Sequence, residues 1–128
     1  MATTELTAQN FEQTVLDNET VFVDFWADWC GPCQRFAPVY EDVSTQHDGI
    51  VFAKVDTEAE QALAAAVNIT SIPTLMAFRD GILVFRQPGA LPKESLQSLV
   101  QQVGALDMEA VRAELADKEA DTSSQQAS

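Results

Sequence analysis

The chain has 128 residues, of which 46% are hydrophobic and 21% are charged, a composition typical of one globular domain with a single core. Seven basic and twenty acidic side chains give a formal net charge of −13, which would repel the phosphates of nucleic acids and anionic lipid headgroups. Composition and charge therefore argue against binding to nucleic acid or membranes, and an N-terminal stretch without Lys or Arg predicts no secretory signal.

The first half of the chain alternates between predicted strands and helices. Residues 4–6 can form a short strand, and Thr7 is expected to cap the helix that follows. The apolar side of this helix would carry Phe11, Val15 and Leu16. Residues 21–27 are apolar at nearly every position, which is typical of a central strand in a parallel sheet with helices on both faces.

A longer helix is expected to begin near Pro32 and to run to about His47, because proline is tolerated in the first turn and apolar residues follow at helical spacing. Pro38 within this helix predicts a kink. A second buried strand over 50–55 and an alanine-rich helix over 58–67 follow. Strands and helices thus alternate up to this point, as in a parallel α/β sheet.

The second half of the chain adds an antiparallel part to the sheet. The dipeptide Asp80-Gly81 lies between the apolar runs 74–78 and 82–85, which predicts a β-hairpin and makes the sheet mixed. A last helix is expected from near Pro92, with one apolar side that would cover a face of the sheet. That side consists of Leu96, Leu99, Val100 and Val103.

A shift in composition divides the chain into a folded domain over 1–104 and an acidic extension over 105–128. Met108, Val111 and Leu115 have the spacing of a short amphipathic helix, and the small polar residues that follow predict a frayed end. We expect this extension to add little to the core.

The run Trp29-Cys30-Gly31-Pro32-Cys33 is the feature that carries chemistry, because it follows a central strand and starts a helix. The partial positive charge and free N–H groups of a helix N-terminus favour a thiolate at Cys30, which makes that sulfur nucleophilic near neutral pH. Cys33 lies one turn further and can attack a mixed disulfide on Cys30. Gly31 leaves the backbone open to a partner, and Pro32 limits the freedom of the loop.

Two other uses of these cysteines have less support. A structural disulfide across so short a loop would contribute only about 2 kcal/mol, less than longer loops supply. A closed zinc site needs four ligands, whereas the chain has two cysteines and one histidine, His47, at a predicted helix end. Since no signal directs the chain to an oxidising compartment, we expect pairing of Cys30 with Cys33 to be transient and functional.

Several motifs together resemble the thioredoxin family, over about residues 5 to 104. They are the run from Val23 to Cys33, Ala37-Pro38, Lys54-Val55-Asp56, Ile72-Pro73-Thr74 and Gly89-Ala90-Leu91. The resemblance implies an α/β thioredoxin fold, with a central five-stranded mixed β-sheet flanked by four α-helices. It also implies Cys30 as nucleophile, Cys33 as resolving thiol, and a cis peptide bond before Pro73.

Asp24 interrupts the apolar strand over 21–27. Burial should raise the pKa of its carboxyl and Lys54 on an adjacent strand should lower it, with burial the larger effect. The resemblance makes Asp24 a buried acid that relays a proton for Cys33, with Lys54 and Trp26 in support. The alternative is an acid that reaches solvent at the end of the sheet.

A flat apolar surface is expected around the two cysteines. Trp26 should pack beneath the active-site loop, whereas Trp29 should stay partly exposed. The contact surface for target proteins would consist of Trp29, Gly31, Pro32, Ile72, Pro73, Gly89 and Ala90. Gln34, Ser71 and Pro88 differ from the residues common in the family, which leaves the preference among partners open.

The resemblance implies a cytoplasmic protein disulfide reductase that passes electrons from a thioredoxin reductase to disulfide-containing target proteins. We expect it to act as a monomer and to bind no cofactor, its redox centre being the Cys30-Cys33 disulfide. A thiol oxidant or isomerase is the enzymatic alternative. A binding module that docks on a partner through residues 105–128 is the non-enzymatic one.

Overall fold

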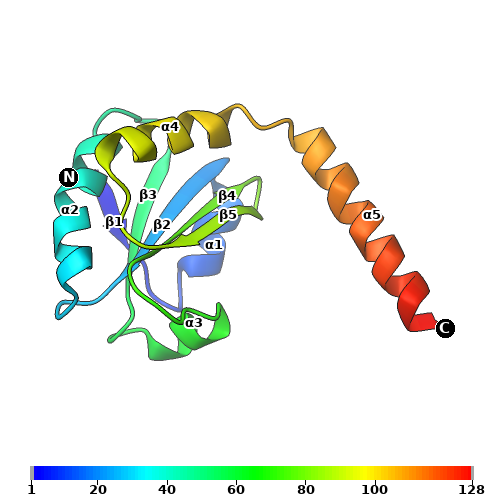
Figure 1. Ribbon diagram of the computed structural model, residues 1–128, viewed down its shortest axis with the longest axis horizontal. Helices are drawn as coiled ribbons and strands as arrows, with labels where there is room; N and C mark the ends of the chain where they lie inside the picture. The colour runs from blue at the N-terminus through cyan, green and yellow to red at the C-terminus, as the bar shows by residue number, and fades with distance from the viewer. Residues whose placement is uncertain (1, 128) are drawn as a thin grey trace.

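The computed structural model describes residues 2–127, with side chains up to Lys118, and consists of a five-stranded sheet with helices on both faces (Figure 1). The strands are β1 (Thr3–Glu5), β2 (Thr20–Trp26), β3 (Val51–Asp56), β4 (Thr74–Arg79) and β5 (Ile82–Pro88). The helices are α1 (Phe11–Asp17), α2 (Gly31–Ser44), α3 (Gln61–Ala66), α4 (Lys93–Gly104) and α5 (Met108–Ala127).

The sheet is mixed, as predicted. Its order is β1-β3-β2-β4-β5, in which β1 and β2 pair with β3 in parallel, whereas β4 runs antiparallel to both β2 and β5. Among the described residues, α1 to α4 are the four helices that the resemblance implies, and α5 is the helix that the spacing of Met108, Val111 and Leu115 predicts in the extension.

Strand β2 lies in the middle of the sheet and is covered on both faces. Phe22 points toward α2 and α4, where it packs in one cluster with Phe36 and Leu96. Phe25 points the other way and packs in a second cluster with Val15 of α1. Because side chains alternate along a strand, the even-numbered positions of β2 face α2.

The first helix begins later than expected. Asn10, and not Thr7, stands at the N-cap of α1, because the Thr7 N–H donates to Asn10 Oδ1 at 2.7 Å and the residues between them form a turn. Val15 is buried, but Leu16 is 60% exposed, since neighbouring residues on a helix point about 100° apart. The expectations for Thr7 and Leu16 are both wrong.

The helix expected over 58–67 also begins later, at Gln61. Asp56 Oδ1 accepts hydrogen bonds from the backbone N–H groups of Glu58 and Ala59, at 2.9 and 3.3 Å. The resulting turn occupies the residues that were predicted to start the helix.

The hairpin between β4 and β5 turns at Asp80-Gly81, as predicted. Both residues have positive φ, 52° and 80°, and a two-residue turn of this kind matches the twist of the strands that it joins. The Asp80 N–H donates to the backbone oxygen of Glu19 at 2.8 Å, which anchors the tip of the hairpin to the segment before β2.

The extension forms a longer helix than expected, since α5 continues to Ala127 where the composition predicts a frayed end. Its first turns contact the domain. Met108 is 7% exposed, and Arg112 forms an ion pair of 2.8 Å with Asp80 at the hairpin tip. The rest of α5 leads away from the sheet (Figure 1).

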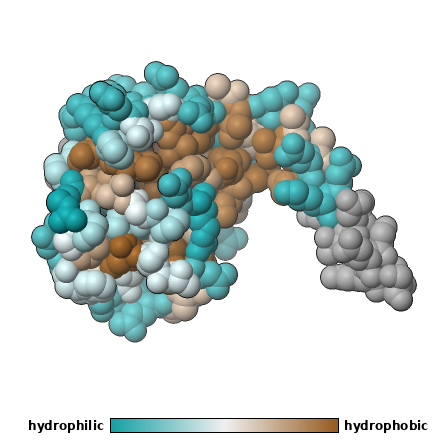
Figure 2. Space-filling model, viewed as in Figure 1, coloured by the Kyte–Doolittle hydropathy of each residue, from teal (hydrophilic) through white to brown (hydrophobic). Residues whose placement is uncertain are grey.

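Hydrophobic surface remains where α5 leaves the domain (Figure 2). A groove of about 320 Å³ lies there between β5 and the first half of α5. Its apolar lining consists of Ile82, Leu83, Val84, Leu106, Val111 and Leu115. None of the helices within residues 2–127 combines the length and the hydrophobicity needed to cross a membrane.

Candidate active site

The two cysteines lie where the central strand passes into α2. Cys30 is the N-cap residue of α2, with an extended backbone, and Pro32 occupies the first turn. Cys30 and Cys33 form a disulfide, with their Cα atoms 5.2 Å apart. The chain is therefore seen in its oxidised state, and the predicted pairing of these cysteines is present.

The sulfur of Cys30 lies in a polar environment supplied by the backbone. The Cys33 N–H, one of the free donors at the helix N-terminus, donates to Cys30 Sγ at 3.2 Å. The backbone oxygen of Ile72 lies 3.7 Å from the same sulfur. Both cysteines are only 3% exposed, so the fold does not distinguish them by exposure in this state.

The loop before β4 faces the disulfide. The Ile72–Pro73 peptide bond is cis, as the resemblance implies. Ile72 is half-buried and packs with the cysteines and Trp26, whereas Pro73 is buried beneath the surface rather than exposed in it. The Gly89 N–H donates to the backbone oxygen of Pro73 at 2.7 Å, which places exposed Gly89 and its neighbour Ala90 next to this loop.

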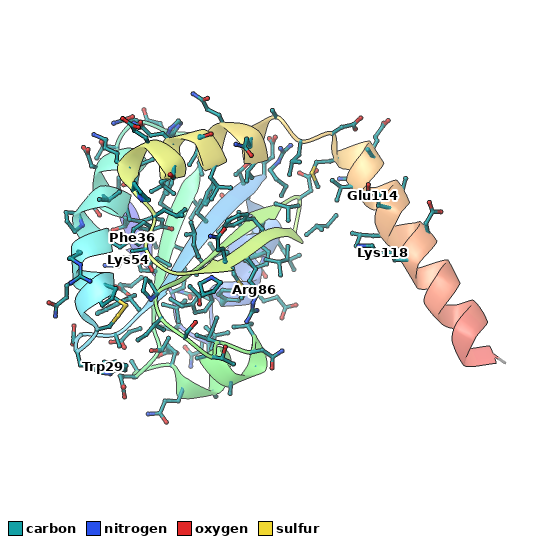
Figure 3. The ribbon with its side chains drawn as sticks, viewed as in Figure 1. Trp29, Phe36, Lys54, Arg86, Glu114 and Lys118 are labelled. Carbon is teal, nitrogen blue, oxygen red and sulfur yellow. A yellow bond between two sulfur atoms is a disulfide. The ribbon has the colours of Figure 1, made fainter. Side chains whose placement is uncertain are left out.

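Trp29 projects from the end of the molecule that carries the disulfide (Figure 3). Its side chain is exposed, at 70%, and its indole Nε1–H donates to Glu58 Oε1 at 2.7 Å. The predicted exposure of Trp29 is confirmed. Sequence reasoning missed Glu58, because this residue was assigned to a helix and in fact lies in the turn after β3.

A groove of about 490 Å³ runs beside Trp29, between α3 and the segment that leads to Pro73. Its walls are formed by Trp29, Thr57, Gln61, Ala64, Ala65 and residues 69–72. Together with the exposed Pro32 and Gly89, this groove gives the redox site an open face that can receive a segment of another polypeptide.

Asp24 is completely buried, so the alternative that it reaches solvent is wrong. Neither of its carboxyl oxygens has a hydrogen-bond partner among the described residues. Burial raises the pKa of Asp24 to about 7; Lys54 opposes this rise and Glu5 adds to it. The expectation that burial outweighs Lys54 is confirmed.

A small cavity of about 90 Å³ joins Asp24 to the redox centre. Its lining includes Asp24, Cys33 and Lys54, and its size is sufficient for water molecules that could connect the carboxyl with the sulfur. Lys54 is in register with Asp24 on the neighbouring strand, and its Nζ lies 4.8 Å from the centre of the Trp26 ring. Trp26 is half-buried, in agreement with its predicted place beneath the loop.

Over residues 2–127, no group of three or more His, Cys, Asp or Glu side chains is arranged to hold a metal ion. His47 lies after the end of α2, with its ring 6.2 Å from that of Phe52.

The family model described as Thioredoxin matches residues 2–102 of the chain. "Putative thioredoxin 2" of Streptomyces coelicolor is 53% identical over 119 residues, which cover 93% of this chain and 89% of that protein. "Thioredoxin 1" of Nostoc is 42% identical over 103 residues, or 79% of this chain and 96% of the relative. Among solved structures, a mutant thioredoxin from Halobacterium salinarum has a TM-score of 0.76 and 35% identity, covering 82% of this chain and 93% of that one.

Proposed function

The chain belongs to the thioredoxin family and is a protein disulfide reductase, and from this premise we propose that Cys30 is its attacking thiol and Cys33 its resolving thiol. The observation that carries this assignment is the place of Cys30 at the N-cap of α2, where its sulfur accepts the Cys33 N–H at 3.2 Å. A donor in that position stabilises a thiolate more than a thiol.

The reaction cycle moves two electrons from the chain to a target protein. The Cys30 thiolate attacks one sulfur of the target disulfide, which breaks the bond and releases the other target sulfur as a thiolate that takes up a proton. Cys33 then loses its proton, attacks Cys30 and releases the second target thiol. The chain is left with the Cys30–Cys33 disulfide.

Asp24 is the proposed proton acceptor for Cys33. The cavity that both residues line supports this role, because water within it could carry a proton between the sulfur and the carboxyl. A carboxyl with a pKa of about 7 holds and releases a proton near neutral pH, which suits a group that must do both in every cycle. Lys54 and Trp26 support the site from the neighbouring strand and from beneath the loop.

Target proteins would dock on the open face around the disulfide. The proposed contact residues are Trp29, Gly31, Pro32, Ile72, Gly89 and Ala90, with Pro73 shaping the face from below. The open groove beside Trp29 and the exposed loop at Gly89 suit an extended polypeptide as the bound segment.

The remaining proposals concern the context in which the domain works. Residues 1–104 form the redox domain and 105–128 an extension outside the catalytic cycle. The chain acts as a monomer in the cytoplasm, whose reducing conditions suit a reductase, and a thioredoxin reductase regenerates the dithiol without a cofactor bound to this chain. The family membership supports this setting.

Reduction of insulin disulfides tests the proposed roles. The wild type should catalyse the reaction, and Cys30→Ser should lose all activity because no attacking sulfur remains. Cys33→Ser should instead form a lasting mixed disulfide with its target, since the resolving step is missing. A Cys30→Ser variant with wild-type activity, or a Cys33→Ser variant that captures no target, would contradict the assignment.

A further inference from the structure

Three charged side chains from neighbouring strands form one row across the sheet. Glu5 of β1 is in register with Lys54 of β3, and Lys54 is in register with Asp24 of β2. Adjacent strands lie about 5 Å apart, and residues in register point to the same face of the sheet. Lys54 therefore lies between two acids in the row. Cys33 lines the small cavity at the end of the row that carries Asp24.

The neighbours of the row show which face it occupies. Two positions before Glu5, the Thr3 hydroxyl donates to Glu41 Oε2 of α2 at 2.6 Å. Two positions before Asp24 and Lys54, Phe22 and Phe52 pack in the cluster that contains side chains of α2. Because alternate residues of a strand share a face, all three charged side chains point toward α2.

Lys54 is free to respond to both acids. In the described part of the chain its ammonium forms no ion pair with Glu5 or Asp24, and its Nζ lies over the ring of Trp26. A lysine has a flexible four-carbon stem, so the position of its charge depends on the balance of the negative charges around it. An ionised Glu5 attracts the ammonium of Lys54 toward β1. With a neutral residue in place of Glu5, Asp24 would be the acid in the row that remains to attract this ammonium.

We propose that Glu5 is a positioning residue for the redox reaction, which draws Lys54 toward β1 and so leaves the Asp24 carboxyl free to take the proton of Cys33. This inference rests on the proton-acceptor role proposed for Asp24. In the step concerned, the proton passes from the Cys33 thiol to Asp24, and the thiolate forms a bond to the sulfur of Cys30. The bond between Cys30 and the target breaks, and the target sulfur leaves with the electron pair.

The directions of the pKa shifts agree with a competition between Asp24 and Glu5 for the ammonium of Lys54. Burial is the main cause that raises the pKa of Asp24, Lys54 lowers it, and Glu5 raises it. Glu5 lies at the exposed end of the row, and its pKa is raised by partial burial, lowered by Lys54 and raised by Asp56 and Asp28. The pKa of Glu41 on α2 is lowered mainly by the hydrogen bond from Thr3 and also by Lys54, so Asp24, Glu5 and Glu41 share the same ammonium. The other titratable groups that face Asp24 are Cys33 and Tyr40 from α2 and Asp28 from the loop at the cavity.

The test compares Glu5→Gln with Glu12→Gln, which removes the same charge from an exposed position on α1. The titration of the Asp24 carboxyl is followed by NMR in the oxidised protein. In Glu5→Gln its midpoint should move to lower pH by roughly half a pH unit, because Lys54 turns toward Asp24. Glu12→Gln should leave the midpoint unchanged, and Glu5→Asp, which keeps the charge, should restore most of the wild-type value.

A second comparison separates competition for Lys54 from simple repulsion between the two acids. In a Lys54→Met background, Glu5→Gln should shift the Asp24 midpoint by less than half as much as in the wild type, because the shared ammonium is gone. An equal shift in both backgrounds overturns the proposal, as does an unchanged midpoint in Glu5→Gln.

The rate of the resolving step distinguishes this proposal from the function on which it rests. Its pH profile, measured in single turnovers on a protein disulfide, should move to lower pH in Glu5→Gln. If Asp24→Asn removes this pH dependence while Glu5→Gln leaves it in place, Asp24 keeps its role and Glu5 loses the one proposed here. If Asp24→Asn leaves the profile unchanged, the role of Asp24 fails, and that of Glu5 fails with it.

Discussion

At the scale of single residues, position and not exposure should separate the two sulfurs. Cys30 and Cys33 are equally buried in the disulfide, but only Cys30 stands at the N-cap and accepts a backbone N–H. In the reduced protein, iodoacetamide should therefore modify Cys30 faster than Cys33, by about tenfold or more. Peptide mass spectrometry after short exposure measures both rates. Equal rates in the native protein, with Cys30→Ser as the control for labelling of Cys33, would contradict the assignment.

Asp24 should destabilise the fold as pH rises. Its folded pKa of about 7 lies above the unfolded value, so between roughly pH 4 and pH 7 the unfolded chain loses this proton while the folded chain keeps it. Asp24→Asn removes the ionisation, and should raise the free energy of unfolding by about 2 to 4 kcal/mol at pH 8 and by little below pH 4. Urea denaturation across this range gives the difference, and the same variant should reduce insulin more slowly.

Lys54→Met serves as the converse test of the same carboxyl. Removing the one cation that lowers the pKa of Asp24 should raise that pKa further and extend the loss of stability to higher pH. The titration of Asp24 in this variant should move above its wild-type midpoint. A midpoint that falls or stays would show that the ammonium of Lys54 does not act on Asp24.

At the scale of secondary-structure elements, one buried arginine holds the end of α4. Arg79 at the end of β4 donates through Nη1 to the backbone oxygens of Val103 and Gly104, at 2.6 and 3.1 Å. Both carbonyls belong to the last turn of α4, where the regular helical hydrogen bonds end, and Arg79 is only 7% exposed. The contact fixes α4 on the sheet immediately before the chain enters α5.

Arg79→Met keeps the aliphatic stem but removes both of these hydrogen bonds, so it should lower the free energy of unfolding by about 2 kcal/mol. The matched control is Glu19→Gln, since Glu19 pairs with Arg79 at 3.5 Å but its side chain is 74% exposed. This variant should lower the free energy of unfolding by less than about 0.5 kcal/mol. Urea midpoints of the two variants give the comparison. A control that costs as much as Arg79→Met would mean that the ion pair, and not the capping, stabilises this corner.

The sequence predicts correctly those elements that are determined by a few residues adjacent in the chain. The hairpin at Asp80-Gly81 needs two residues with positive φ, and the two residue types that accept such a backbone stand there. The cysteine motif likewise acts within one turn of α2. Helix starts were less predictable, because a turn held by Asp56 competes with the helical pattern that begins at Glu58.

Side-chain neighbours across strands could be predicted only in part. Asp24 and Lys54 were expected on adjacent buried strands, and their register confirms this. Glu5 was missed because its register with Lys54 comes from the pairing of β1 with β3, two strands that are distant along the chain, which no local pattern encodes. The same limit explains Glu58, whose bond to Trp29 joins residues that are distant along the chain.

At the scale of the whole molecule, two truncations test where the domain ends. A chain that stops at Ala105 loses the buried side chain of Met108, and should be less stable by about 2 kcal/mol. A chain that stops at Arg112 keeps Met108 and the pair with Asp80, and should match the full chain. Both should reduce insulin at the full rate. Thermal unfolding measures the stabilities. A loss of stability in the chain that stops at Arg112 would mean that the rest of α5 also packs on the domain.

The course of α5 has a practical consequence for attaching the protein to other objects. The redox face lies at the end of α2, whereas the C-terminal helix leaves the domain at the far side from α2 (Figure 1). A helix of 20 residues is about 30 Å long. A tag joined after this helix would act as a tether with its own spacer. Molecules immobilised in this way on a bead should present Trp29 and the dithiol to large substrates. Coupling through a residue near β1 would instead place the surface of the bead beside α2.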